Sequence, residues 1–325
     1  MIITRTPFRM SYVGGGTDIA SFYKTKKGAV LSTSINKYMY ITLHKRFEEG
    51  IRLSYSKTED VSSIEDIQHP LVREALKMVE VYDGIEITSA ADIPSTGSGL
   101  GSSSSYTVGL LSALHEYKGL KPSLKDLANM ACEIEIHRLQ APNGKQDQFA
   151  AAHGGLKLYE FLPDESVNIL PVECDLDFKD LIDESTMIFY TGLTRSAISI
   201  LKEQSEKNIS KQNFKSLEQM VELVYKFKSA IESSNFLYMC EILKENWSLK
   251  KNLSSNISNS KIDEMYQTGI KAGALAGKIL GAGAGGFLMF FAHKKDHSAI
   301  ESALEDYRRC YFSMEESGTK VIFND

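Results

Sequence analysis

The sequence has few cysteines and no basic region of the kind that binds nucleic acid. Its four cysteines, Cys132, Cys174, Cys240 and Cys310, lie far apart and form no Cys-x-x-Cys pair. This spacing indicates neither a zinc site nor a disulfide framework, so we expect reduced thiols in a cytoplasmic protein. The formal net charge is -5, whereas nucleic-acid-binding surfaces are basic and clustered. The composition therefore favours a small-molecule partner and no nucleic acid.

Long apolar segments are also missing. The first residues, 1–7, lack the apolar centre of a signal peptide, and the uncharged runs 93–114 and 279–292 are too rich in Gly or Ser to span a bilayer. We therefore expect no targeting segment and no membrane contact. A chain of 325 residues with 42% hydrophobic residues is long enough for about two globular domains. No pattern fixes the oligomeric state, so a homo-oligomer is left open.

The most distinctive stretch, residues 94–105, is rich in Gly and Ser and poorly suited to a core. A strand pattern precedes it at 84–93 and a helical pattern follows at 106–117. Glycines let the backbone approach a ligand, and a helix start offers free N–H groups with a partial positive charge. Together these features predict a polyphosphate cradle, with hydroxyls that could also ligate Mg²⁺. The glycines and serines that carry this prediction are Gly97, Ser98, Gly99, Gly101, Ser102, Ser103, Ser104 and Ser105.

A linker and two well-known nucleotide loops fit residues 94–105 less well. A flexible linker could have the same composition, but linkers are rarely held so closely between a strand and an apolar helix. No Gly-Lys-Ser/Thr follows the glycines, which excludes a Walker A loop, and the glycine spacing is not that of a dinucleotide-binding fold. A different phosphate-binding family is required.

Two further places combine acidic side chains with features of a site. A strand over 2–12 ends in the glycine turn 13–18, which presents Asp18 either as a ligand or as a simple cap. A helix over 123–138 starts with a capping-box variant, and its apolar periodicity places Glu135 on the inward face and Glu133 on the opposite face. A buried acid needs a partner, and a metal ion or a basic side chain would serve.

The loop over 142–155 carries short polar groups between glycines, which suits close approach of a ligand. Its Asp147 could equally cap a following helical turn. Further along, the acidic and aperiodic residues 175–185 are our candidate link between domains 1–175 and 176–325. A glycine loop at 281–286 contains Gly-x-Gly-x-x-Gly, but a strand pattern follows it, so the dinucleotide-binding context is wrong. Helix 298–309 and strand 320–323 complete an α+β pattern.

Three of these stretches resemble the motifs of the GHMP kinases, the superfamily of galactokinase, homoserine, mevalonate and phosphomevalonate kinases. Gly99-Leu100-Gly101-Ser102-Ser103 matches the core of the family's Pro-x-x-x-Gly-Leu-Gly-Ser-Ser, although Pro94 lies one residue further away than the pattern asks. Gly144–Gln148 resembles the family's Gly-x-x-Asp loop, and the 281–286 loop with Gly283 resembles its third motif. The fold that this resemblance implies is a ribosomal-protein-S5-like domain followed by a ferredoxin-like domain.

The resemblance also implies roles for individual residues. Asp147 would be the catalytic acid/base, Arg9 would hold it ionised, and the Pro94–Ser104 loop would bind ATP. Ser103 and Glu135 would place Mg²⁺. The first motif runs from Arg9 to the sugar-binding Asp18, nine positions later, with Gly15-Gly16 in place of the family's Glu-His before Thr17-Asp18. Basic residues in or beside the motifs are candidates for a substrate phosphate, namely Arg5, Lys145 and Arg195.

Within the family, the glycine turn, Gly-Lys-Gln-Asp-Gln and Thr-Gly-x-Thr-Arg most resemble the D-glycero-D-manno-heptose 7-phosphate kinases. These enzymes use ATP to phosphorylate the anomeric hydroxyl, which gives a 1,7-bisphosphate for nucleotide-activated heptose synthesis. Two alternatives are kept open: a kinase for another sugar such as fucose, and a non-catalytic sugar-binding protein of the same fold.

Overall fold

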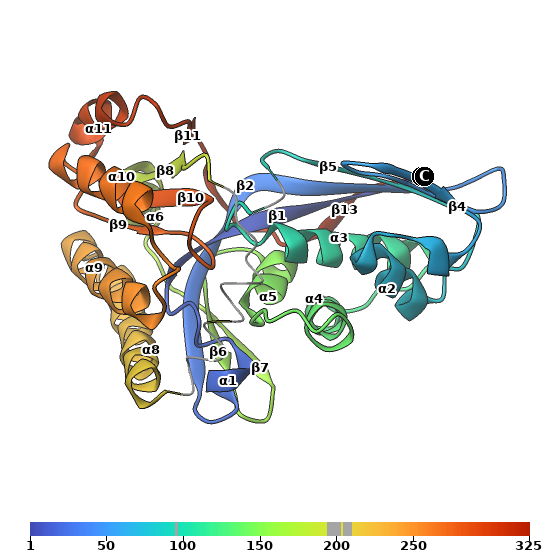
Figure 1. The fold of residues 1–325 in the computed structure, drawn as a ribbon, viewed down its shortest axis with the longest axis horizontal. Coiled ribbons are helices and arrows are strands. Elements are labelled where there is room, and N and C mark those ends of the chain that lie inside the picture. The colour runs from blue at the N-terminus through green and yellow to red at the C-terminus, as the bar shows by residue number, and fades with distance from the viewer. Residues whose placement is uncertain (95–96, 194–202, 204–209) are drawn as a thin grey trace.

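The computed structural model describes residues 1–94, 97–193, 203 and 210–325, which form two β-sheets with helices packed on them (Figure 1). The candidate phosphate ligand Arg195 lies outside the described residues. The elements of the first part are β1 (Ile2–Val13), α1 (Ala20–Tyr23), β2 (Gly28–Lys45), β3 (Ile51–Ser54), β4 (Thr58–Val61), α2 (Pro70–Val79), β5 (Ile85–Ala91), α3 (Ser102–Tyr117), α4 (Leu124–Cys132), α5 (Gln146–His153), β6 (Lys157–Phe161) and β7 (Val167–Pro171).

The second part is mostly helical and returns to the first sheet at its end. Its elements are α6 (Leu176–Ser185), β8 (Thr186–Tyr190), α8 (Lys211–Glu232), α9 (Phe236–Leu253), α10 (Ser260–Lys271), β9 (Ala276–Ile279), β10 (Phe287–Phe291), α11 (His297–Ala303), β11 (Arg309–Cys310), β12 (Met314–Glu315) and β13 (Lys320–Asn324).

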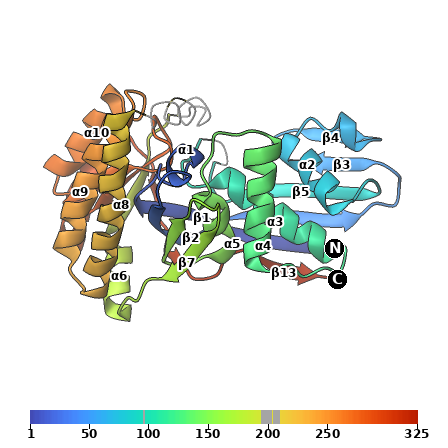
Figure 2. The ribbon, with the colours of Figure 1, turned by 90° about the horizontal axis from the view of Figure 1, so that it is seen from below.

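The long strand β2 organises the first sheet. It pairs with β1 along most of its length, with β6 near its start and with β5 near its end. The main path of the sheet is β13-β1-β2-β5-β3-β4, and all of these pairs are antiparallel except β3 with β5. Both chain ends lie together in Figure 2, where Met1 and Asp325 exchange backbone hydrogen bonds. The first sheet therefore contains the last residues of the chain as well as the first.

Helices α2, α3, α4 and α5 lie on one side of this sheet (Figure 1). Helix α3 packs directly on β1 and β2, which explains why the helix that follows the glycine-rich loop is buried along most of its length. The other sheet, ordered β11-β8-β10-β9, packs against α9 and α10, whereas α8 packs against α9 and against β1 and β2 of the first sheet. Tyr12 at the end of β1 stacks on Phe227 of α8 and Phe291 of β10, so the two parts share one core.

Three sequence-based expectations need correction. Residues 176–185 form helix α6, capped by the Asp175 side chain, and not an irregular link; short amphipathic helices with many acids resemble loops in sequence. The helix expected to continue to Arg138 changes to a π-helical turn over Glu133–Arg138. The helix expected over 298–309 is shorter and lies at His297–Ala303.

Candidate active site

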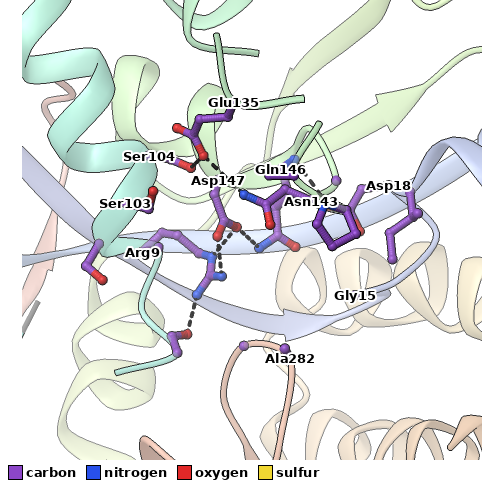
Figure 3. Close-up of a pocket in the computed structure, with 18 of the residues that line it drawn as sticks. Arg9, Gly15, Asp18, Ser103, Ser104, Glu135, Asn143, Gln146, Asp147 and Ala282 are labelled. Carbon is purple, nitrogen blue, oxygen red and sulfur yellow. Dashed lines mark hydrogen bonds and ion pairs between the residues drawn. The ribbon is translucent and has the colours of Figure 1, made fainter. Parts of the chain in front are cut away.

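The main cavity opens where the two parts meet and has a volume of about 680 Å³. Loops from both parts form its walls, together with the first turns of α2, α3 and α5, Glu135 of the π-helical turn and Lys250 of α9, and Figure 3 shows most of the polar residues of this lining. Its lining residues come from the end of β1, from the glycine-rich loop before α3, from the turn before α5, from α9 and from the loop between β9 and β10. The cavity therefore joins all three stretches that the sequence singled out.

The glycine-rich loop reaches the cavity with its backbone. Gly97, Gly99 and Gly101 have φ angles of +66°, +76° and +75°, which side chains with a Cβ rarely adopt. Gly101 is the N-cap of α3, so the first N–H groups of this buried helix are directed to the cavity side of the loop. The loop is fixed to β1 by a hydrogen bond from the Arg9 N–H to the Leu100 carbonyl, at 3.0 Å. This arrangement favours an anion at the helix start.

The two glycine loops touch each other backbone to backbone. A Cβ on Gly281 would lie 2.5 Å from the Gly99 Cα, and a Cβ on Gly286 would lie 2.3 Å from the Ser98 carbonyl oxygen. The same Ser98 carbonyl accepts a hydrogen bond from the Phe287 N–H at 3.2 Å. Gly281 and Gly286 are thus required by the close approach to the first loop, whereas Gly283 and Gly285 approach the Ile257 and Leu193 carbonyls.

Arg9 and Asp147 meet at the cavity wall as a two-point ion pair. The Arg9 Nε and Nη2 atoms each lie 2.8 Å from one carboxylate oxygen of Asp147. The third guanidinium nitrogen, Nη1, donates to the Gly99 carbonyl at 2.6 Å. The arginine side chain is 6% exposed, whereas the Asp147 side chain is 29% exposed. A buried guanidinium therefore holds a carboxylate that is open to the cavity.

Asp18 holds the turn that presents Asp147. Its Oδ1 atom accepts the Gly16 N–H at 2.9 Å and its Oδ2 atom accepts the Gln146 N–H at 3.3 Å. A Cβ on Gly144 would lie 1.9 Å from Oδ2, so only glycine fits beside this carboxylate. Burial raises the pKa of Asp18, and the negative charge of Asp147 raises it further. The sequence-predicted first motif and the Asp147 loop are therefore one structural unit.

Glu135 points inward, as the helical periodicity predicts, whereas Glu133 is exposed. Its Oε2 atom accepts hydrogen bonds from Ser104, Asn143 and Gln148 at 3.1, 3.2 and 3.2 Å. Its Oε1 atom is buried and has no hydrogen-bond partner within the described residues. Burial raises the pKa of Glu135 to about 7. A carboxylate with one buried, unpaired oxygen beside the phosphate loop fits a magnesium ligand.

Not every predicted site residue lines the cavity. Arg5 pairs with Glu315 at 3.8 Å and lies over the Tyr38 ring, and Lys145 pairs with Glu165 at 3.5 Å and donates to the Glu165 carbonyl at 2.7 Å. Both charges are paired outside the cavity in this structure, so neither side chain is placed to bind a phosphate there. The other predicted residues that are described but do not line the cavity are Thr17, Pro94, Leu100, Ser105 and Gly283.

Lys250 also lines the cavity, although no sequence motif includes it. This residue of α9 is 4% exposed, and its Nζ donates to the Gly281 carbonyl at 2.7 Å on the cavity wall. Burial lowers the pKa of Lys250 to about 8, and the nearby charge of Arg9 contributes to the lowering. A lysine among the inward positions Leu243, Asn246 and Trp247 was the signal that could have revealed it.

A glycine-rich loop at a helix start and a carboxylate fixed beside it are parts that phosphoryl transfer to a small molecule uses. Two family profiles match the chain: the GHMP kinases N-terminal domain over residues 70–155 and the GHMP kinases C-terminal domain over residues 227–311. The chain belongs to the GHMP kinase family and is a sugar kinase that uses ATP. The α+β GHMP kinase fold that the motifs predicted is confirmed.

The chain is similar in sequence to several named sugar kinases. The chain is 31% identical over 305 residues to the D-glycero-alpha-D-manno-heptose 7-phosphate kinase of Campylobacter jejuni, with 89% of each chain covered. It is 26% identical to the L-fucokinase/L-fucose-1-P guanylyltransferase of Bacteroides fragilis, over 89% of this chain and 34% of that protein. A putative sugar kinase structure from Campylobacter jejuni superposes with a TM-score of 0.80 at 28% identity, over 98% and 97% of the two chains.

A structure described as a D-glycero-D-manno-heptose 1-phosphate kinase from Bacteroides thetaiotaomicron superposes with a TM-score of 0.84 over 100% of both chains. At 23% identity, this likeness bears on the fold alone. Among the helices of the described residues, none has the length and apolarity needed to cross a membrane.

Proposed function

We propose that the protein transfers the γ-phosphoryl group of ATP to the anomeric hydroxyl of D-glycero-D-manno-heptose 7-phosphate and releases the 1,7-bisphosphate and ADP. The observation that carries the reaction type is the Asp147 carboxylate, held by Arg9 between the phosphate loop and the turn of Asp18. The substrate is supported by the 31% identity to a kinase named for that sugar phosphate.

In the proposed reaction the anomeric oxygen attacks the γ-phosphorus, a new O–P bond forms, and the bond to the β,γ-bridging oxygen breaks. Asp147 accepts the hydroxyl proton or orients the hydroxyl, and Arg9 offsets the negative charge of the phosphoryl group. Arg9 is suited to this because it contacts both the Asp147 carboxylate and the Gly99 carbonyl of the phosphate loop. Asp18, Gly15 and Gly16 line the same cavity and are the proposed sugar-binding residues.

The loop over 97–104 is the proposed ATP site. Its glycines bring the backbone to the cavity, and the start of α3 supplies N–H groups for the phosphates. Burial of the helix behind the loop keeps these N–H groups in fixed positions, which suits a reaction that depends on positioning.

Mg²⁺ fits beside this loop. The proposed ligands are Ser103 and Glu135. A bound ion would give the unpaired Glu135 Oε1 a partner, and Ser103 carries an exposed hydroxyl group in the first turn of α3. The part of the chain that the structure describes contains no group of three or more acidic, His or Cys side chains suited to a metal. Mg²⁺ commonly binds one or two carboxylates and completes its shell with water and nucleotide phosphates. When bound, the ion offsets charge on the phosphates.

The experiment is ADP release measured with a panel of acceptors: the heptose 7-phosphate, the unphosphorylated heptose, L-fucose and galactose. We expect the highest kcat/KM with the heptose 7-phosphate. Highest efficiency with L-fucose would favour the second candidate, a fucose kinase, which the similarity to the L-fucokinase sequence makes a specific alternative. No ADP release with any acceptor would favour a sugar-binding protein.

A cytoplasmic location and the domain boundary at 175/176 stay predictions.

A further inference from the structure

Lys250 is buried at the junction of the two parts of the site. Its Nζ donates to the Gly281 carbonyl of the second glycine loop at 2.7 Å, and a Cβ on Gly15 would lie 3.4 Å from the same Nζ. Gly15 belongs to the proposed sugar turn, whereas Gly281 touches Gly99 of the phosphate loop. The ammonium group therefore lies between the proposed sugar site and the proposed nucleotide site, on the wall of the cavity.

Within the described residues, no ion pair neutralises this ammonium group, and Asp18 and Asp147 act on it only from a longer distance. Arg9 is matched by Asp147 in a two-point ion pair, but Lys250 has no carboxylate within ion-pair distance in the described residues. Its single protein acceptor there is a neutral carbonyl, although an ammonium group can donate three hydrogen bonds. A buried charge without a partner is costly, so this arrangement favours a state in which an anion enters the cavity.

A second buried lysine shows the contrast. Lys278 of β9 donates to the Ser11 and Tyr12 carbonyls, each at 2.9 Å, and it does not line the cavity. Burial lowers the pKa of Lys278 well below that of a free lysine. Lys278 thus joins β9 to β1 by two hydrogen bonds. Lys250 uses one of its three N–H donors within the described residues, and it lines the cavity.

We propose that Lys250 binds the phosphoryl group during its transfer, with its ammonium group on an oxygen of the ATP γ-phosphate. This assignment rests on the proposed kinase reaction but does not depend on which sugar accepts the group. The position between Gly15 and Gly281, beside Arg9 and Asp147, is the place where the γ-phosphate must meet the acceptor hydroxyl. A fixed cation at that place stabilises the charge that moves through the transition state.

The test compares two nucleotides by calorimetry in the presence of magnesium chloride: ADP and the non-hydrolysable β,γ-imido analogue of ATP. The Kd of ADP divided by the Kd of the analogue, here called the γ-phosphate ratio, measures how much the γ-phosphate contributes to binding. No sugar is needed. In Lys250→Met this ratio should fall about tenfold or more, which is the scale of a hydrogen bond to a charged group. A ratio within about twofold of the wild-type value, even with a lower kcat, would overturn the proposal.

Lys251→Met is the matched control. Its side chain is 36% exposed, pairs with Asp263 at 3.6 Å and lies over the Trp247 ring, so it leaves the same helix turn without touching the cavity. We expect an unchanged γ-phosphate ratio for this variant. An equal loss in both variants would mean that α9 is merely perturbed, which also overturns the proposal.

A second measurement uses the unmodified protein, so it holds even if Lys250→Met does not fold. Because the pKa of Lys250 is lowered to about 8, the γ-phosphate ratio should fall as the pH rises from about 7 to about 9.5. The charged groups that face Lys250 are Arg9, Asp18, Asp147 and Lys278, and burial already raises the pKa of Asp18 and lowers that of Lys278. A flat ratio across this range would contradict the assignment.

Failure of all acceptors in the ADP assay would reject the sugar kinase reaction and leave this binding test intact.

Discussion

Arg9 and Asp147 lie 138 positions apart in the chain, yet their side chains are joined by two hydrogen bonds of 2.8 Å. The same guanidinium also holds the Gly99 carbonyl at 2.6 Å. One buried arginine therefore fixes the distance between the proposed acid/base and the proposed phosphate loop. Because phosphoryl transfer depends mainly on positioning and charge, this three-point contact is the structural basis of the proposed reaction.

Replacing Asp147 by Asn tests the acid/base role. Asn keeps the shape but loses the charge and the ability to accept the hydroxyl proton, so kcat should fall about 100-fold or more. ATP affinity should change far less. The measurements are kcat with the preferred acceptor, ATP affinity by calorimetry, and the melting temperature.

The control for this variant is Asp306→Asn, at an exposed acid outside the cavity. It should leave all three quantities near the wild-type values. Asp147 lies in the first turn of α5 with Lys145 at the N-cap, so a purely local role in the helix would also be filled by Asn. A near-native kcat in Asp147→Asn would therefore reject the catalytic assignment.

Gly101→Val should abolish or sharply weaken ATP binding. A Cβ at this position would lie 3.2 Å from the Arg9 Cγ and 3.4 Å from the Asp147 Oδ2, and the φ of +75° disfavours a β-branched residue. The matched control is Gly119→Val, because Gly119 has a φ of +69° and open space around its Cβ position. Both variants should lose stability through backbone strain, but only Gly101→Val should lose ATP binding. Equal ATP affinities in the two variants would show that the loop containing Gly101 does not bind ATP.

Glu135→Gln should lower activity and raise the Mg²⁺ concentration needed for half-maximal rate, because a neutral amide is a weaker ligand for Mg²⁺. Glu133→Gln should do little, since Glu133 is exposed and pairs with Arg138 at 3.6 Å. Because burial raises the pKa of Glu135 to about 7, a proton competes with the ion, and the wild-type Mg²⁺ requirement should fall as the pH rises from about 6 to about 8. A larger effect at Glu133 would show that the metal ligand is wrongly assigned.

The same substitution should stabilise the protein when Mg²⁺ is absent. The folded-state pKa of Glu135, about 7, lies above its ordinary 4.5, so its contribution to stability is complete below pH 4.5 and is lost as the pH rises through 7. That shift corresponds to about 3 kcal/mol. In EDTA, the melting temperature of Glu135→Gln should therefore exceed that of the wild type by more at about pH 8 than at about pH 5. If the difference in melting temperature does not grow with pH, the pKa of Glu135 is not raised in the folded protein.

Much of the site could be predicted from local sequence. Helical periodicity placed Glu135 inward and Glu133 outward, and the Gly-rich stretch between a strand and a helix predicted the loop before α3. The spacing of polar residues around Asp147 indicated a ligand loop but left open whether its carboxylate would cap a helix. The family resemblance implied its pairing with Arg9, which local sequence could not show because the pair depends on the packing of β1 against α5.

The remainder depends on tertiary contacts. Arg5 and Lys145 are basic and close to motifs in the sequence, yet Glu315 and Glu165 occupy their charges, and the partner of Arg5 comes from the far end of the chain. Lys250 lies outside all three motifs and reaches the cavity because α9 packs beside β9. Helix α6 was missed because its acidic surface masks a short buried stripe that includes Phe178 and Ile182.

Phosphorus NMR of the reaction products decides whether this chain phosphorylates the anomeric hydroxyl of a heptose 7-phosphate. With ATP, Mg²⁺ and D-glycero-D-manno-heptose 7-phosphate, we expect ADP and a sugar with two phosphorus signals, one of which couples to the anomeric proton. The Asp147→Asn protein, at equal concentration, should form this product about 100-fold more slowly. A product phosphorylated at another hydroxyl, or ADP formed with only inorganic phosphate, would contradict the proposed reaction.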